Sequence, residues 1–139
     1  MMIYKETYTS SVDNSGVVYM KCIHIHGGFR QREAKAGGMV TITCRKVKPK
    51  KKKRPFRKGD VVKGVVIASK RSFRKPDSSR TGFLYNAIIP FQRKAQQEWL
   101  GPRLGCTRLK SPITFSYDYE RIHKETKKKL FSLANKIIR

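Results

Sequence analysis

The stretch Lys58-Gly59-Asp60-Val61-Val62-Lys63-Gly64-Val65-Val66-Ile67-Ala68-Ser69 decides the fold class. Its first part, Gly59-Asp60, is typical of a tight turn, because glycine accepts positive φ and aspartate bonds to its own backbone. The residues that follow, Val61–Ser69, are mostly apolar and β-branched, which favours an extended strand buried inside a sheet. The stretch therefore predicts a central β-strand that the chain enters through a turn.

Further strand-like stretches lie on both sides of this one. Val17–His26 follows the turn signal Asp13–Gly16, and Ala87–Phe91 carries Pro90 near its end, as placement at a sheet edge requires. Met39–Arg45 alternates between apolar and polar residues, which predicts a half-buried strand. Its apolar face consists of Val40, Ile42 and Cys44, and its polar face of Thr41, Thr43 and Arg45. The first two-thirds of the chain is therefore expected to be mainly β.

The periodicity changes toward the C-terminus. Asp118–Ile138 carries apolar residues at roughly helical spacing and turns Lys127–Lys129 outward, which predicts one helix or two. The apolar positions are Ile122, Leu130, Leu133, Ala134 and Ile137. With 139 residues, the chain has room for a single domain.

The charge balance is the strongest feature of the composition. Lys and Arg number 33 against 9 Asp and Glu, which gives a formal charge of +24. Self-repulsion at this density opposes a compact state unless a polyanion neutralises it. No apolar run approaches the ~20 residues that span a bilayer, and the basic residues are spread through the whole chain. Three widely spaced cysteines favour a reducing compartment. Nucleic acid is the expected partner, and a membrane is not.

Two segments concentrate the positive charge. Lys48–Lys58 has eight basic residues in eleven and is expected to be a loop that buries no apolar area, although a nuclear-localisation or linker segment is an alternative. Lys70–Asn86 reads as two polar arms around the turn Pro76–Ser79, hence a projecting hairpin with Phe73 and Tyr85 interleaved among cations. The residues expected to contact RNA are Arg30, Arg32, Lys48, Lys50, Lys51, Lys52, Lys53, Arg54, Arg57, Lys58, Lys70, Arg71, Phe73, Arg74, Lys75 and Arg80.

A metal site is the first alternative to RNA binding. Cys22, His24 and His26 occupy alternate positions, so on a regular strand all three would face the same side, and Cys44 is a conceivable fourth ligand. The spacing matches no common zinc frame. The favoured interpretation is a buried cysteine beside two polar or RNA-facing histidines, with no metal or cofactor.

Catalysis is the second alternative. A metal-dependent nuclease needs clustered carboxylates, whereas the only acids between Ala34 and Gln97 are Asp60 and Asp77, each inside a turn signal. A metal-free nuclease based on His24 or His26 would need a second histidine, and His123 is remote in sequence. The sequence has no glycine-rich phosphate loop and no nucleophile elbow. The chain is therefore not expected to be an enzyme.

Seven short motifs in order, from about Ser11 to Pro102, resemble those of the universal fourteenth protein of the large ribosomal subunit. They are Val12-Asp13-Asn14-Ser15-Gly16, Cys22-Ile23 followed by Gly27-Gly28, Lys58-Gly59-Asp60-Val61-Val62, Val65-Val66-Ile67, Arg74-Lys75-Pro76-Asp77, Phe83 with Asn86-Ala87, and Gly101-Pro102. The resemblance implies a five-stranded β-barrel with a projecting β-ribbon and short C-terminal helices.

The same resemblance implies a structural protein that binds large-subunit rRNA near the intersubunit face. It would pack against neighbouring ribosomal proteins and contribute to a bridge with the small subunit and its rRNA. By motif, Arg74, Lys75 and Lys58 would face RNA, whereas Gly16, Gly59 and Asn86 would be architectural. The alternative is a free single-strand RNA-binding or RNA-chaperone module on an oligonucleotide-binding barrel.

The resemblance also divides the chain. Residues 1–104 would form the barrel, with the basic loop at 48–58 and the ribbon at 69–86, and residues 105–139 the helical segment, with an insertion at 112–128. The family's Thr-Arg-Ile before Gly-Pro is replaced by Glu98-Trp99-Leu100. The start of the chain resembles bacterial and organellar members, and the divergence suggests a mitochondrial ribosome, with bacterial and plastid ribosomes as alternatives.

Overall fold

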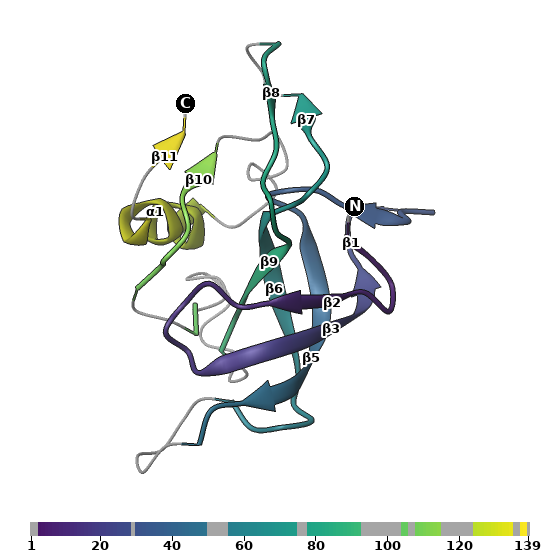
Figure 1. Ribbon diagram of the computed structural model, residues 1–139, viewed down its shortest axis with the longest axis vertical. Coiled ribbons are helices and arrows are strands. Elements are labelled where there is room, and N and C mark those ends of the chain that lie inside the picture. Colours follow the sequence, from purple (N-terminus) through teal and green to yellow (C-terminus); the bar gives the residue numbers. More distant parts are fainter. Residues whose placement is uncertain are drawn as a thin grey trace.

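The computed structural model describes residues 3–28, 30–49, 56–74, 78–92, 104–105, 108–114, 124–134 and 137–138. Five strands close into a barrel in the order β2-β3-β5-β6-β9, from which a β-ribbon projects (Figure 1). The barrel strands are β2 (Tyr8–Ser10), β3 (Val17–Ile25), β5 (Met39–Val47), β6 (Val61–Ala68) and β9 (Ala87–Pro90). The expected mainly-β class and the five-stranded barrel are confirmed.

The barrel is antiparallel except where it closes. β2 and β9 run parallel and meet at a single residue pair, Ser10 with Ala87. Beyond Ala87, β9 keeps only β6 as its neighbour within the barrel, with Gly64 opposite Pro90. Proline, which has no N–H to donate, is therefore accommodated at the end of β9.

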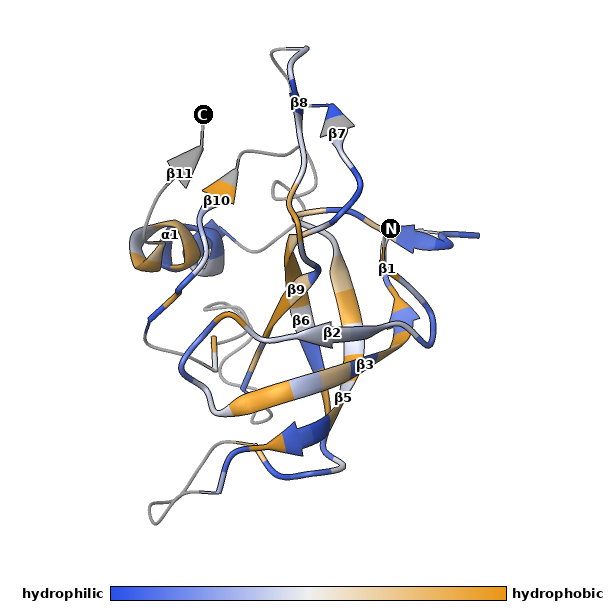
Figure 2. Ribbon diagram, in the orientation of Figure 1, coloured by the Kyte–Doolittle hydropathy of each residue, from blue (hydrophilic) through white to orange (hydrophobic). Residues whose placement is uncertain are grey.

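β6 has apolar neighbours on both of its faces. Val62 and Val66 belong to the core inside the barrel, together with Ile88 of β9. Val65 and Ile67 point the other way, into a second apolar cluster. A strand covered on both faces needs a nearly continuous apolar run rather than an alternating one, which explains the sequence of this stretch (Figure 2).

Gly64 allows β9 to approach β6 closely. A Cβ at this position would lie 2.8 Å from Ile88 Cγ2 and 2.8 Å from the Ile89 carbonyl oxygen, both closer than side-chain atoms tolerate. The glycine in the middle of the strand is therefore a packing requirement.

The predicted apolar face of β5 is confirmed, whereas Thr43 of the predicted polar face is also buried. Val40, Ile42 and Cys44 are completely buried, whereas Arg45 is exposed. The strand runs two residues further than predicted, to Val47, because Val17 of β3 pairs with that residue.

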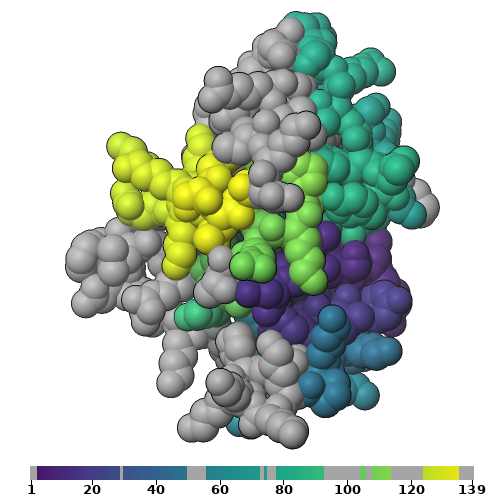
Figure 3. Space-filling model, turned by 60° about the vertical axis from the view of Figure 1, so that its left-hand side comes forward, coloured from purple at the N-terminus to yellow at the C-terminus, as the bar shows by residue number. Residues whose placement is uncertain are grey.

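The second apolar cluster lies outside the barrel and is covered by the C-terminal part of the chain. It contains Val65, Ile67, Ile89, Phe91, Leu104, Leu109, Ile113 and Leu130. Leu130 comes from helix α1 (Lys124–Leu133), and Ile113 from β10 (Ile113–Thr114). Figure 3 shows the helix beside segment 108–114 on one face of the molecule. No helix in the described part of the chain is long and apolar enough to cross a membrane.

The predicted helix is shorter than expected. The described helix begins at Lys124 and ends at Leu133, and residues 115–123 lie outside the described ranges. The expectation that Ile137 continues the helix is wrong, because β11 (Ile137–Ile138) pairs in parallel with β10. Two consecutive β-branched residues favour this extended backbone.

The prediction that the basic loop buries no apolar area is also wrong. Phe56, near its C-terminal end, is 1% exposed and belongs to the barrel core. A Cβ on Gly105 would overlap the Phe56 ring, so the later segment packs directly against the loop. The sequence pattern obscured this anchor because a single aromatic residue stands among cations.

Besides β10 and β11, four further very short strands lie outside the barrel. β7 (Phe73–Arg74) and β8 (Arg80–Thr81) form the predicted projecting ribbon. β1 (Ile3–Tyr4) and β4 (Glu33–Ala34) pair beside the barrel and, like β2, carried no recognisable alternation in the sequence. The division of the chain at 104/105 and the insertion at 112–128 stay predictions.

Replacing Phe56 with Ala is expected to lower the free energy of unfolding by about 3–5 kcal/mol, because the change removes a fully buried ring and leaves a cavity. Urea unfolding in high salt, which screens the self-repulsion of the chain, measures the change. Arg57→Ala, at the exposed neighbouring position, is the control and should leave the stability nearly unchanged. Equal effects of the two substitutions would contradict the packing described for Phe56.

Candidate nucleic-acid interface

The base of the β7–β8 ribbon is fastened to the barrel by hydrogen bonds. The backbone N–H of Lys70 donates to Asn86 Oδ1 at 2.9 Å, and the N–H of Phe83 donates to the Ser69 carbonyl oxygen at 3.1 Å. Asn86 therefore stabilises the base of the ribbon through its side chain. Beyond this point the ribbon projects away from the barrel (Figure 1).

Two arginines face each other across the ribbon. Arg74 of β7 pairs directly with Arg80 of β8, and both side chains are exposed. Like charges opposite each other destabilise a strand pair. Within the described part of the chain, neither guanidinium forms an ion pair with a carboxylate. The ribbon thus presents a pair of cations that an external anion would stabilise.

The segment around β4 lies against the base of the ribbon. Glu33 Oε2 is 3.9 Å from Arg71 Nη1 and accepts a hydrogen bond from the Tyr4 hydroxyl at 3.3 Å. Arg30 and Arg32, just before β4, are exposed. These two arginines and Arg71 therefore belong to the same end of the molecule as the ribbon.

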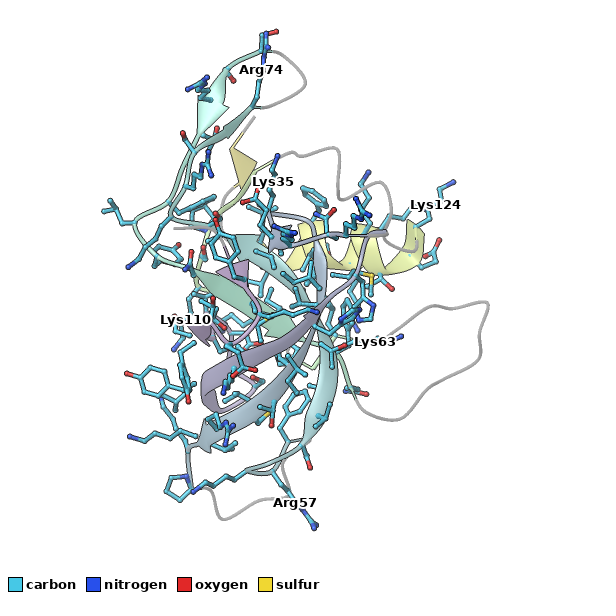
Figure 4. The ribbon with its side chains drawn as sticks, turned by 90° about the vertical axis from the view of Figure 1, so that its right-hand side faces the viewer. Lys35, Arg57, Lys63, Arg74, Lys110 and Lys124 are labelled. Atoms are coloured by element: carbon cyan, nitrogen blue, oxygen red, sulfur yellow. The ribbon has the colours of Figure 1, made fainter. Side chains whose placement is uncertain are left out.

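The described ends of the basic loop lie at the opposite end. Lys48 is held at its backbone by Gly16, with 2.8 Å between N and O, and Arg57 N–H donates to Asp60 Oδ2 at 2.9 Å. The side chains of Lys48, Arg57 and Lys58 are exposed. Figure 4 shows Arg57 at one end of the long axis and Arg74 at the other.

The predicted RNA-contacting residues thus form two groups rather than one patch. The ribbon group consists of Arg30, Arg32, Lys70, Arg71, Arg74 and Arg80, and the loop group of Lys48, Arg57 and Lys58. The remaining predicted residues, Lys50, Lys51, Lys52, Lys53, Arg54 and Lys75, lie outside the described ranges, as does the side chain of Phe73.

Each carboxylate of the described residues forms a hydrogen bond or an ion pair with a nearby group. Their partners are Lys21 for Glu6, Ser11 and Ser15 for Asp13, Arg71 and Tyr4 for Glu33, the Arg57 N–H for Asp60, and Lys128 for Glu125. Acids therefore serve turns and local pairs. The exposed cations of the two groups, apart from Arg30 and Arg71, have no carboxylate partner among the described residues and are available to an external anion.

The aromatic residues are distributed differently from the expectation. Tyr85 is half-buried and its hydroxyl lies 2.5 Å from Ser111 Oγ, so it joins the ribbon to the C-terminal segment rather than offering a free ring. Two tyrosines that the sequence reading missed, Tyr8 and Tyr19, are 60% and 50% exposed on β2 and β3. Tyr8 was missed because β2 is too short to show alternation.

The expectation that Cys22, His24 and His26 share one face is wrong. Cys22 pairs with Ile42 and His24 with Thr41, so one extra residue bulges out of β3 between them. The bulge turns Cys22 into the core and His24 outward. Across the described ranges, no three His, Cys, Asp or Glu side chains are grouped for a metal ion.

These positions can be compared with known protein families. The sequence model described as Ribosomal protein L14p/L23e matches residues 2–138. The chain belongs to this family. The resemblance of the ordered motifs is thereby confirmed, and the chain is a structural protein of the large ribosomal subunit that binds rRNA. Members of the L14p/L23e family are structural proteins and not enzymes.

The two buried cysteines should resist alkylation in the folded chain. Burial, reinforced by the carboxylate of Glu6, raises the pKa of Cys22 to about 11; burial, with Asp60 and Asp13, raises the pKa of Cys44 to about 11. At pH 8 only about one thiol in a thousand is then ionised. Iodoacetamide should label neither cysteine until urea unfolds the chain, and peptide mass spectrometry resolves each position. Rapid labelling of the folded chain at both positions would refute their burial.

Proposed function

We propose that this chain ties together two separate segments of large-subunit rRNA near the intersubunit face, one at the ribbon end and one at the loop end. The observation that carries the proposal is the pair Arg74 and Arg80, opposed across the ribbon with no carboxylate partner among the described residues. A phosphate group between two guanidiniums replaces their repulsion by two charge-assisted hydrogen bonds. Lys75, at the same tip in the sequence, is proposed to extend this contact.

The rest of the ribbon group supports a contact with folded RNA. Arg71 Nη1 lies 3.9 Å from Glu33 Oε2, and the exposed Arg30 and Arg32 come shortly before Glu33 in the chain. Cations on a rigid scaffold fix the position of an RNA backbone without reading its sequence. The projecting ribbon would enter a groove or junction of the RNA, with Phe73 proposed to stack on a base or ribose.

The loop group supports the second contact. Phe56 and the turn at Asp60 anchor the C-terminal end of the loop, and Lys48 is anchored through Gly16. Both ends of the lysine run are thus attached to the rigid barrel. We propose that Lys50–Arg54, together with Lys48, Arg57 and Lys58, neutralises phosphates of a different rRNA segment.

Further partners follow from the family. We propose that the chain packs against neighbouring large-subunit proteins, with the segment 112–128 as an added contact, and contributes to a bridge with small-subunit rRNA. The segment Glu98-Trp99-Leu100, which departs from the family, lies outside the described ranges. Cross-links from this chain to small-subunit rRNA in assembled ribosomes would support the bridge, and cross-links confined to the large subunit would refute it.

The ribosome is proposed to be mitochondrial, on the strength of the divergence of the sequence from its family. Detection of the chain by mass spectrometry in ribosomes purified from mitochondria tests this assignment. Its presence only in another ribosome population, bacterial or plastid, would overturn it.

Removing the opposed arginines should reduce the salt dependence of RNA binding. Each lost phosphate contact lowers the slope of log K against log salt by about 0.9. Arg74→Ala and Arg80→Ala should therefore each reduce the slope by about one for a structured large-subunit rRNA fragment, as measured by filter binding across a salt series. Lys21→Ala is the matched control, since Glu6 already neutralises Lys21.

An unchanged slope for both ribbon variants would contradict the proposed contact. The same assay separates the proposed role from a free single-strand-binding module. Poly-uridine should compete poorly with the structured fragment if the chain recognises folded rRNA, and equally well if it binds single strands.

A further inference from the structure

A small cavity opens beside the barrel, between the end of β3 and the start of β5. Its volume is about 180 Å³, and it is lined by His26, Gly27, Gln31, Ala34, Lys35, Gly37, Gly38 and Met39. Pockets that enclose drug-sized ligands measure roughly 300–1,000 Å³. The cavity therefore suits one planar ring system rather than a large ligand.

The walls of the cavity are suited to a flat, partly polar ring. Gly27, Gly37 and Gly38 line the cavity without side chains, and Ala34 and Met39 add apolar surface. Glycine permits such close approach of a ligand to the backbone. The Gln31 amide, whose Nε2 donates to the Glu33 carbonyl oxygen at 2.8 Å, brings a hydrogen-bonding group to the opening.

His26 adds an aromatic wall that is neutral at physiological pH. Its Nε2 lies 2.7 Å from Thr41 Oγ1, and the His24 ring packs against it edge-on at 4.9 Å. Burial lowers the pKa of His26, and the nearby His24 and Lys63 lower it further. An uncharged imidazole held in one orientation can accept or donate a hydrogen bond to a ring edge and contact its face.

The rim of the cavity is positively charged. Lys35 is exposed at the opening and forms no ion pair with any described residue, and the exposed Arg32 belongs to the same loop. Glu33, the acid closest in sequence, is already engaged by Arg71 and Tyr4. Figure 4 shows Lys35 between Arg74 and Arg57, on a face that connects the two charged ends.

We infer that this cavity binds a single unpaired nucleotide of the rRNA, with its base between His26 and the glycine backbone and its phosphate at Lys35. Charge complementarity selects this occupant, since the rim attracts an anion while the interior accepts an uncharged ring. The inference rests on the proposed function and adds a base-binding subsite to contacts that otherwise involve only phosphates. An extruded base would fix the register of the chain on its RNA.

The test compares two substitutions at Gln31 in assembled large subunits. Gln31→Trp places an indole at the opening and blocks the cavity, whereas Gln31→Ala removes the same hydrogen bond and leaves the cavity open. Chemical probing of rRNA base edges should reveal one nucleotide that is protected with the wild-type chain and with Gln31→Ala. With Gln31→Trp, its reactivity should rise to that of unpaired loop nucleotides.

A second pair of substitutions tests the rim. Lys35→Ala should raise the reactivity of the same nucleotide part of the way, because the base remains accommodated while its phosphate loses a cation. Lys46→Ala removes an equal charge from an exposed position on β5 and should change nothing at that nucleotide.

The outcomes separate this inference from the proposed function. If wild-type and variant chains all sediment with large subunits but no nucleotide changes on blocking the cavity, the subsite is refuted and the proposed function stands. If the wild-type chain itself does not sediment with large subunits, the proposed function fails.

If only the Gln31→Trp variant fails to assemble, the inference is tested on the isolated wild-type chain instead. The measurement is the binding of adenosine 5′-monophosphate and uridine 5′-monophosphate. Amide shifts in nuclear magnetic resonance spectra should then concentrate at Gly27, Gly37 and Gly38 for one of the nucleotides and be absent for ribose 5-phosphate. Equal shifts with ribose 5-phosphate, or shifts spread over all basic segments, would overturn the inference.

Discussion

The structure depends on the burial of β6 on both of its faces. Val62 and Val66 close the barrel core, while Val65 and Ile67 support the cluster to which α1 and β10 attach. The close approach of β9 at Gly64 joins the two cores through one strand pair. A small protein with a large net charge has few apolar residues from which to build a core. In this arrangement a single strand, β6, contributes apolar side chains to both clusters. The ribbon and the described ends of the basic loop both extend from this centre.

The distribution of acids explains why the chain needs a polyanion. The described carboxylates close turns or satisfy nearby groups, as Asp60 does for the loop and Glu33 for the ribbon base. They stabilise the scaffold locally without neutralising the two charged ends. Arg74 and Arg80 consequently face each other without a counter-charge from the described part of the chain. An anion bound at these ends would also remove the repulsion that opposes compactness, so we expect folding and RNA binding to be linked.

The sequence predicts those elements in which one local pattern dominates. The alternation of Met39–Arg45, the apolar run of Val61–Ser69 and the turn at Asp60 all lead to the observed barrel. The sequence pattern gives a wrong prediction where tertiary contacts determine the conformation or the burial of a residue. Phe56 is buried because Gly105 leaves room for its ring, and Ile137 is extended because β10 offers it a partner strand. Neither contact has a local signal. For the candidate interface, exposure of the described cations follows from composition, but their separation into two ends requires the barrel geometry.

The two charged ends are proposed to contact different segments of large-subunit rRNA. Hydroxyl-radical cleavage of the rRNA from an iron chelate tests this proposal most directly. The chelate is tethered at Arg57→Cys or at Arg74→Cys, each in a Cys106→Ser background. Large subunits assembled with each variant should show two separate sets of cleaved rRNA nucleotides, one for each tether. The buried Cys22 and Cys44 should stay unlabelled. Cleavage of the same nucleotides from both tethers, or of none from either, would contradict the account.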